Sequence, residues 1–136
     1  MIVRDAMTDY FASANIRSTV GDAMEKMLSE GLDVLLIVDD SSKLVGSLRE
    51  PFLMEALLDH QLQNDLVSLH METDSISAFP EEPITSVIEK FQRHQSSEFP
   101  VVIGGKLVGI LTRRQLLRAV LSSKEQKLRR FSTYVA

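Results

Sequence analysis

The residues whose types and spacing could carry chemistry lie in the run Thr112-Arg113-Arg114-Gln115. A hydroxyl at the point where a strand ends and a helix begins can meet a phosphate, together with the N–H groups of the first helical turn. Arg113, Arg114 and Arg118 could attract a polyphosphate, although exposed arginines are more often only solvated. The same run also forms a capping box, in which Thr112 caps the helix and Gln115 reaches back to its N–H. Two interpretations are open, an anion-binding corner and a cap without a ligand.

Other kinds of chemistry lack the residues that they need. His60, His70 and His94 lie far apart in the sequence and share no metal-ligand spacing. The chain has no cysteine, which excludes a disulfide scaffold, a thiolate metal site and a cysteine nucleophile. It has no Gly-x-Ser-x-Gly elbow, no P-loop and no dinucleotide glycine pattern. We therefore expect no metal site and no enzymatic activity.

An internal repeat governs the elements that must position these residues. Lys43-Leu44-Val45-Gly46 recurs as Lys106-Leu107-Val108-Gly109, at an offset of 63 residues. Further upstream the offset is 64, and there Glu25-Lys26 falls on Glu89-Lys90. The offset changes in a turn that is one residue shorter in the second copy, and hairpin loops tolerate such a change at little cost. The sequence therefore predicts two copies of one structural unit.

Each copy predicts the same order of elements. Apolar residues at helical spacing predict helices at residues 20–28, 51–62, 84–91 and 113–123. Ser18 or Thr19 suits the cap of the first helix, and Pro83 suits the first turn of the third. Short apolar runs predict hairpin strands at residues 34–38, 44–48, 100–103 and 107–111, with further short strands near 75–79 and 10–14. The loop Gly104-Gly105 favours a tight turn between the last two hairpin strands.

The size of the chain agrees with this reading. Its 136 residues are 44% hydrophobic and 25% charged, which is typical of one ordinary domain or two very small ones. A β-α-β-β-α unit of about 60 residues is marginal alone, because its apolar face stays uncovered, and two packed units solve this. We expect a first repeat at residues 1–62, a second at 63–123 and a basic C-terminal tail at 124–136.

Charge and hydropathy restrict the location and the partners. Residues 1–112 carry a net charge of −10 and residues 113–136 one of +6. The acidic body argues against nucleic-acid binding, because phosphate neutralisation needs a basic surface. The tail could contact nucleic acid or an acidic partner, but we favour its docking on the acidic body of a dimer partner. No apolar run is long enough for a membrane span and the N-terminus lacks a signal-peptide core, so we expect a cytoplasmic protein without a membrane partner.

The doubled pattern resembles a tandem pair of CBS domains, the cystathionine-beta-synthase-type repeat, in the arrangement often called a Bateman module. The resemblance covers roughly residues 1–123 and rests on Val3 to Thr8, Thr19 to Met27, the hairpin ending at Gly46, and their copies through Thr112. It implies an α/β (α+β) fold of two β-α-β-β-α repeats, related by a pseudo-two-fold axis, with sheets packed face to face. It also implies two clefts that can bind adenosine-containing ligands, and dimerisation. Such pairs are regulatory sensors rather than catalysts.

The ligand motif of that family is glycine, two apolar residues, threonine or serine, two free positions and aspartate. In the second repeat Thr112 matches, whereas Gln115 replaces the aspartate and could still accept a ribose hydroxyl bond without charge assistance. In the first repeat Arg49 and Phe52 hold the two positions. The first site therefore looks disabled as a ribose reader, although Arg49 could contribute charge to a phosphate.

The resemblance implies further contacts around Thr112. Phe99, before Pro100 and Val101, would line an adenine slot, and Ile76, Ser77 and Ala78 would form the opposite wall. Phe99-Pro100 could equally be core and strand-start residues, because proline is tolerated at the first residue of a strand. The expected ligand-binding residues are Thr112, Gln115, Arg113, Phe99, Pro100, Val101, Ile76 and Ala78.

These expectations combine into a regulatory module rather than an enzyme. The second-repeat cleft would sense AMP, ADP, ATP or a related adenosyl ligand, as a regulatory ligand and not an obligatory cofactor. The expected homodimer would then signal to an unidentified effector protein by population shift. The alternative is a ligand-free dimerisation or protein-interaction module with degenerate clefts, which Gln115 and Phe52 favour.

Overall fold

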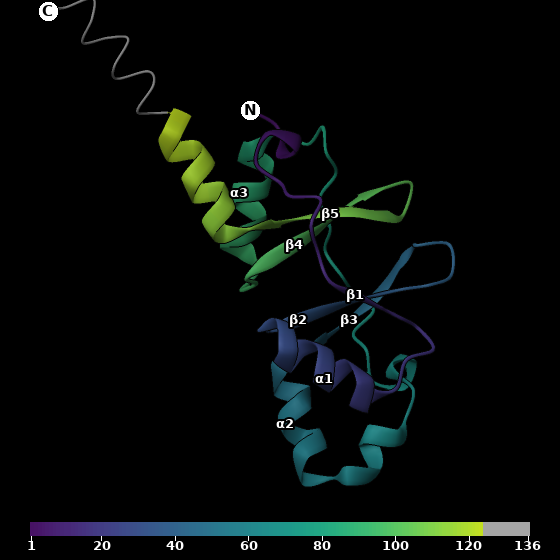
Figure 1. Ribbon diagram of the computed structural model, residues 1–136. Helices are drawn as coiled ribbons and strands as arrows, with labels where there is room; N and C mark the ends of the chain where they lie inside the picture. The colour runs from purple at the N-terminus through teal and green to yellow at the C-terminus, as the bar shows by residue number, and fades with distance from the viewer. Residues whose placement is uncertain (124–136) are drawn as a thin grey trace, which may run out of the picture. The chain divides into compact units, whose positions relative to one another are not determined.

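The computed structural model describes residues 1–123 and divides into two compact units (Figure 1). Unit 1 contains Met1–Tyr10, Ser77–Val101 and the chain from Val108 onward, and unit 2 contains Phe11–Ile76 and Val102–Leu107. Each unit thus takes most of its residues from one repeat and shorter segments from the other. The fold is mixed α/β with two small sheets in the described residues, as predicted, and the tail 124–136 lies outside them.

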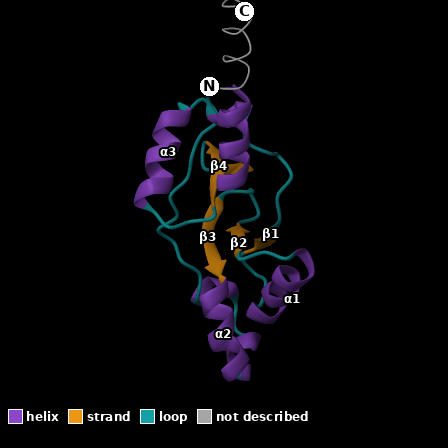
Figure 2. Cartoon of the chain, turned by 90° about the vertical axis from the view of Figure 1, so that its left-hand side faces the viewer, coloured by secondary structure: helices purple, strands orange, loops and turns teal. Residues whose placement is uncertain are grey.

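The sheet of unit 2 has three strands in the order β1-β2-β3 (Figure 2). β1 (Ser13–Asn15) runs parallel to β2 (Val34–Val38), and β2 runs antiparallel to β3 (Leu44–Arg49). All five residues of β2 are apolar and its three central residues are buried. Since apolar side chains on both faces of a strand need cover on both faces, β2 belongs in the middle of the sheet.

Two helices cover the sheet of unit 2. α1 (Val20–Glu30) begins at Thr19, whose hydroxyl accepts the Asp22 N–H at 3.2 Å, and ends at Gly31 in the left-handed conformation. α2 (Glu50–Leu58) ends four residues before the predicted boundary at Leu62, because the Asp59 side chain accepts the Gln61 N–H at 3.1 Å and starts a separate 3-10 turn. That turn, His60–Asn64, and a second one, Val67–Leu69, complete the unit. The core contains Ala23, Met27, Leu35, Ile37, Leu48 and Val67.

Unit 1 repeats this plan with a shorter sheet. A 3-10 turn (Val3–Asp5) precedes α3 (Ile84–Arg93), which is followed by β4 (Glu98–Ile103), β5 (Lys106–Thr112) and a helix at residues 113–123. Gly104 and Gly105 join the two strands with φ of 56° and 82°, and two positive φ values in succession are what a type I′ turn requires. The tip of this hairpin, residues 102–107, is counted with unit 2.

Three boundaries of unit 1 differ from the predictions. Pro83 precedes the first turn of α3 as its N-cap instead of occupying that turn. β4 begins two residues earlier than predicted, so Pro100 is its third residue and not its first. The strand predicted near residues 75–79 is reduced to a single bridge between Ala78 and Val101, whereas the one predicted near residues 10–14 forms β1.

The internal repeat is nevertheless kept in register. Ala14 pairs with Ile37 and Ala78 with Val101, both in parallel and both at an offset of 64. The equivalent lysines of the two copies also make the same hydrogen bond. The Lys26 ammonium group donates to the Ser13 carbonyl oxygen, and that of Lys90 donates to the Ser77 carbonyl oxygen. These shared pairs confirm that the chain contains two structural copies of one unit.

The glycine of each Lys-Leu-Val-Gly run lets another segment approach its strand. Thr8 and Ile110 exchange backbone hydrogen bonds of 3.0 Å beside Gly109, and Ser47 and Glu72 exchange bonds of 2.9 and 2.8 Å beside Gly46. A Cβ at position 109 would lie 2.5 Å from the Thr8 carbonyl oxygen, and one at position 46 would lie 2.8 Å from that of Glu72. Only glycine therefore fits at these crossings without a shift of the backbone.

Candidate functional site

The helix of residues 113–123 begins with a complete capping box. The Gln115 N–H donates to Thr112 Oγ1 at 3.1 Å, and the Thr112 N–H donates to Gln115 Oε1 at 3.0 Å. The predicted capping box is thus confirmed. It uses the Thr112 oxygen as an acceptor, and the hydroxyl hydrogen and the Gln115 amide hydrogens are not part of it. Both side chains are therefore fixed at the junction of β5 and the helix while they retain donor groups.

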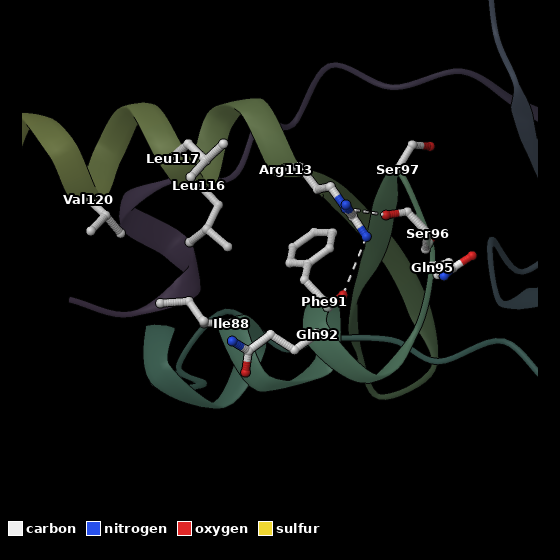
Figure 3. Close-up of a pocket in the computed structure, with 10 residues that line it drawn as sticks. All are labelled: Ile88, Phe91, Gln92, Gln95, Ser96, Ser97, Arg113, Leu116, Leu117 and Val120. Atoms are coloured by element: carbon white, nitrogen blue, oxygen red, sulfur yellow. Dashed lines mark hydrogen bonds between the residues drawn. The ribbon is translucent and has the colours of Figure 1, made fainter.

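Arg113, which was predicted to contact a ligand, is engaged within unit 1 (Figure 3). Its Nε donates to the Ser96 carbonyl oxygen at 2.8 Å, and its Nη2 donates to that of Phe91 at 3.4 Å. Its guanidinium carbon also lies 5.7 Å from the centre of the Phe91 ring. The Phe91 carbonyl is in the last turn of α3, where carbonyl groups lack helical partners. Arg113 therefore links the carboxyl end of α3 to the start of the next helix.

Four more of the predicted residues come together in the interior of unit 1. The Ala78 N–H donates to the Pro100 carbonyl oxygen at 2.9 Å, and Val101 is paired with Ala78. Phe99 packs against Phe91 with 4.4 Å between the ring centres. Phe99, Val101 and Ala78 are each at most 2% exposed. Ile76, the remaining predicted residue, belongs to unit 2.

A groove of about 860 Å³ runs between α3 and the helix of residues 113–123 (Figure 3). Its apolar part is lined from both helices, by Ile88, Phe91, Leu116, Leu117 and Val120. Gln92, Gln95, Ser96, Ser97 and Arg113 line the remainder. Of the predicted ligand-binding residues, the groove lining includes Arg113 but not Thr112 or Gln115, so the groove is not centred on the predicted ligand site.

The sequence analysis predicted both helices from their apolar stripes, but such a stripe does not show whether it faces the core or lines a groove. In the structure Leu117, which belongs to the stripe of the second helix, is 62% exposed. The arginine at the edge of the groove is already bound to carbonyl groups, and most of the wall is apolar. Such a surface suits an apolar protein face better than a nucleotide.

The equivalent junction in unit 2 is built from different pairs. Arg49, at the position of Thr112, donates from Nε to Glu72 Oε2 at 3.1 Å. Phe52, at the position of Gln115, stacks on His70 with 4.9 Å between ring centres and 23° between planes. His70 in turn lies 2.8 Å from Asp65. Both motif positions of the first repeat are therefore occupied by contacts with the segment of residues 70–72.

Glu82 is a buried carboxylate in unit 1, two residues before the start of α3. Its side chain is 3% exposed and pairs with Lys90 at 2.8 Å. Burial raises the pKa of Glu82, but hydrogen bonds from Lys90 and Ser86, the positive charge of Lys90 and the Phe79 N–H together hold it below its ordinary value. Glu82 therefore stays ionised at neutral pH, and no sequence signal distinguished it from its neighbour Glu81.

The described part of the chain offers neither a metal site nor a membrane span. Among residues 1–123, no three His, Asp or Glu side chains are grouped so that they could hold a metal ion. Each helix in the same stretch is too short or too polar to cross a bilayer.

Comparison with known proteins places this arrangement in a family. The chain matches the CBS domain over residues 3–50 and 65–122. It is 25% identical to AcuB from Vibrio cholerae, with a TM-score of 0.81 over 95% of this chain and 96% of that one. It is 27% identical to CBSX2, which was solved in complex with AMP, with a TM-score of 0.79 over 90% of this chain and 98% of that one. CBSX2 is a CBS-pair protein of Arabidopsis thaliana.

A third solved structure holds other adenosyl compounds. The CBS domain pair of protein MJ0100, solved with 5′-methylthioadenosine and S-adenosyl-L-methionine, is 25% identical, with a TM-score of 0.75 over 91% of this chain and 98% of that one. The curated relatives are longer. The chain covers 41% of protein MJ1225 of Methanocaldococcus jannaschii, at 28% identity over 116 residues, and 24% or less of the enzymes that it matches. The enzymes thus share only the CBS region with this chain, which itself belongs to the CBS domain family and carries two CBS domains in tandem.

Proposed function

We propose that this CBS pair is a regulatory module that senses an adenosine-containing ligand at its second repeat, and that it is not an enzyme. AMP is bound by CBSX2, and S-adenosyl-L-methionine and 5′-methylthioadenosine by MJ0100, so an adenosyl ligand is the class that the relatives support. AMP, ADP and ATP are the first candidates for this chain. A cytoplasmic location is part of the proposal and rests on the cysteine-free composition.

The observation that carries the proposal is the contrast between the two strand-to-helix junctions. Arg49 and Phe52 are bound to Glu72 and His70, whereas Thr112 and Gln115 are bound to each other and retain donor groups. The N–H groups of the first turn of a helix favour an anion. A phosphate or ribose hydroxyl at Thr112 would therefore meet a hydroxyl and an amide, which the first repeat replaces by Arg49 and Phe52.

A buried pair of residues in unit 1 supports the same site, because the resemblance assigns both to the ligand. Ala78 and Val101 form a single bridge, and the Ala78 N–H donates to the Pro100 carbonyl oxygen. We propose that Phe99 to Val101 and Ala78 flank the base, and that Gln115 meets the ribose. Arg113 would act from the edge of the site, because its guanidinium is held by Ser96 and Phe91.

The expected homodimer also belongs to this proposal. Met54 and Leu58 on α2 are 60% and 90% exposed, and their repeat counterparts Leu117 and Leu121 are 62% and 56% exposed. Large apolar side chains that recur exposed at matching positions favour burial against another protein surface. A ligand that stabilises one arrangement of the dimer would shift its population, and an effector protein, which the chain itself does not identify, would recognise that arrangement.

The test is a thermal-shift panel with AMP, ADP, ATP and S-adenosyl-L-methionine on the wild type and on Thr112→Val. A ligand at a hundredfold excess over its Kd adds about 2.7 kcal/mol to the free energy of unfolding. We expect a shift for the wild type that is lost in Thr112→Val. Thr19→Val is the control, because it removes a threonine cap of the same kind at the start of α1 and leaves the second repeat intact.

The alternative function is a ligand-free interaction module. The capping box favours it, since it accounts for Thr112 and Gln115 without any ligand. No shift with any of the compounds, on a folded sample, would establish this alternative. An equal shift in Thr112→Val and wild type would place the ligand elsewhere.

A further inference from the structure

Glu82 is the centre of a buried polar network in unit 1. Its carboxylate accepts hydrogen bonds from Lys90 Nζ at 3.0 Å, from Ser86 Oγ at 2.6 Å and from the Phe79 N–H at 3.3 Å. A buried ion pair is seldom more stabilising than well-packed apolar side chains in the same place. Its value lies more often in fixing one arrangement of the groups around it. The question is therefore which groups Glu82 holds in place.

The first of these groups is the extended segment of residues 77–79, which contains the Ala78 bridge to Val101. Lys90 Nζ, while paired with Glu82, also donates to the Ser77 carbonyl oxygen at 2.8 Å. The next residue, Ala78, donates its N–H to Pro100. This segment is thus held from α3 by one ammonium group and from β4 by one backbone bond. Without Glu82, that ammonium group would be left half-buried and without its counter-charge.

The second group is the N-terminal segment. The Val3 N–H donates to the Glu82 carbonyl oxygen at 2.9 Å, and the Arg4 N–H donates to that of Pro80 at 2.9 Å. The Arg4 and Glu81 side chains form an exposed ion pair beside these bonds. The turn at residues 80–82 therefore follows the segment of residues 77–79 directly in the chain and is hydrogen-bonded to the N-terminal segment.

The first repeat has no carboxylate at the position of Glu82. Lys26 donates to the Ser13 carbonyl as Lys90 does to that of Ser77. Ser18, however, stands at the position of Glu82, and a serine supplies no charge. The repeat that retains the Thr112 junction is thus also the one in which a carboxylate orients the lysine.

We propose that Glu82 is a positioning residue for the ligand site of the second repeat and that it couples this site to the N-terminal segment. Through Lys90 it holds Ser77 and Ala78, and through its backbone it holds Val3. This inference rests on the proposed function, because the segment of residues 77–79 is taken as one wall of that site. A ligand that orders this segment then also orders residues 3–4.

The first experiment needs no ligand. Amide hydrogen exchange is compared between the wild type, Glu82→Gln and the matched first-repeat variant Lys26→Met. We expect Glu82→Gln to raise the exchange of the Val3, Arg4 and Ala78 amides by about tenfold or more, because these bonds open together. Lys26→Met should leave the three amides as they are. Unchanged exchange in Glu82→Gln would overturn the positioning role.

The second experiment uses AMP as the probe. We expect Glu82→Gln to raise the Kd for AMP by about tenfold, which is about 1.4 kcal/mol, and Lys26→Met to leave it unchanged. In the wild type, AMP should slow the exchange of the Val3 amide, and in Glu82→Gln this protection should be lost. A merely structural role would lower Tm and leave Kd unchanged, which would contradict the proposal.

The two experiments separate the two claims. If the wild type does not bind AMP or the other adenosyl compounds, the proposed function fails, while the exchange of Ala78 and Val3 without ligand still decides whether Glu82 holds them. If the wild type binds AMP and Glu82→Gln binds it equally well, the function stands and the positioning role is wrong. Ser86→Ala removes one donor without unpairing a charge, and it gives the same test in a milder form if Glu82→Gln does not fold.

Discussion

The junction between β3 and α2 and the junction between β5 and the following helix occupy equivalent places in the two repeats and differ in what their side chains bind. Arg49 and Phe52 in the first are paired with the segment of residues 70–72. Thr112 and Gln115 in the second are paired with each other. The segment that crosses β5 carries Ala6 and Thr8 where residues 70 and 72 are His and Glu. We call the first junction closed, because its motif side chains bind another segment, and the second open, because its motif side chains bind each other. The two junctions share one backbone arrangement and differ in the side chains at four equivalent positions.

The largest predicted effect is a loss of stability on truncation of a core leucine, and it should be similar in the two repeats. Leu48 and Leu111 are repeat counterparts, at 1% and 0% exposure. We expect Leu48→Ala and Leu111→Ala each to lower the free energy of unfolding by about 2–5 kcal/mol, because each leaves a cavity in a buried strand. Urea denaturation measures both. A loss below about 1 kcal/mol for either variant would contradict the view that the repeats are equally packed.

The crossing of a second segment over each junction gives the next largest effect. Gly109→Ala would place a Cβ 2.5 Å from the Thr8 carbonyl oxygen, and Gly46→Ala would place one 2.8 Å from that of Glu72. We expect losses of about 1–3 kcal/mol, larger at Gly109, since a backbone must move in both cases. Gly21→Ala, whose nearest atom is 3.2 Å away, is the milder control. Equally small losses of unfolding free energy at all three positions would contradict the close approach of a second segment to Gly109 and Gly46.

The buried carboxylate of unit 1 predicts a difference in pH dependence between the repeats. The pKa of Glu82 is lowered from the ordinary value of 4.5, so its contribution to stability is complete above that value and is lost as the pH falls through the lowered pKa. The difference in unfolding free energy between wild type and Glu82→Gln should therefore be constant from about pH 7 to about pH 5 and shrink in more acid solution. Guanidinium titrations at several pH values measure it. A difference in unfolding free energy that grows as the pH falls would contradict a lowered pKa of Glu82.

The smallest predicted effect concerns the ion pair that closes the first junction. Arg49 and Glu72 have side chains that are 40% and 62% exposed. A double-mutant cycle with Arg49→Ala and Glu72→Ala should therefore give a coupling of about 0.2–1 kcal/mol, and salt should weaken it. A coupling that persists in high salt would indicate that the pair is less solvated than its exposure implies.

The sequence was sufficient for the fold and for the cap at the second junction. The repeat predicted both copies of the unit, because identical spacing of apolar residues and glycines imposes identical elements. Thr112 and Gln115 were identified as a possible capping box, since that motif is local and spans only four residues. Local patterns of this kind are readable because they depend on few neighbours.

The contacts that distinguish the junctions could not be predicted in the same way. The pairs of Arg49 with Glu72 and of Phe52 with His70 join residues about twenty positions apart, and they depend on which segment crosses β3. The burial of Glu82 depends likewise on the N-terminal segment that covers its turn. The groove beside Leu117 was missed because an apolar stripe indicates a buried face and not the identity of the partner that buries it.

The most direct test of the account is a calorimetric titration of the wild type, Thr112→Val and Thr19→Val with AMP. We predict a single class of site, one AMP per chain, bound by the wild type and by Thr19→Val and lost or strongly weakened in Thr112→Val. Two equivalent sites per chain would contradict the closed first junction. Full binding by Thr112→Val, or no binding by a folded wild type to AMP or the other adenosyl compounds, would contradict the assignment of the open junction as a ligand site.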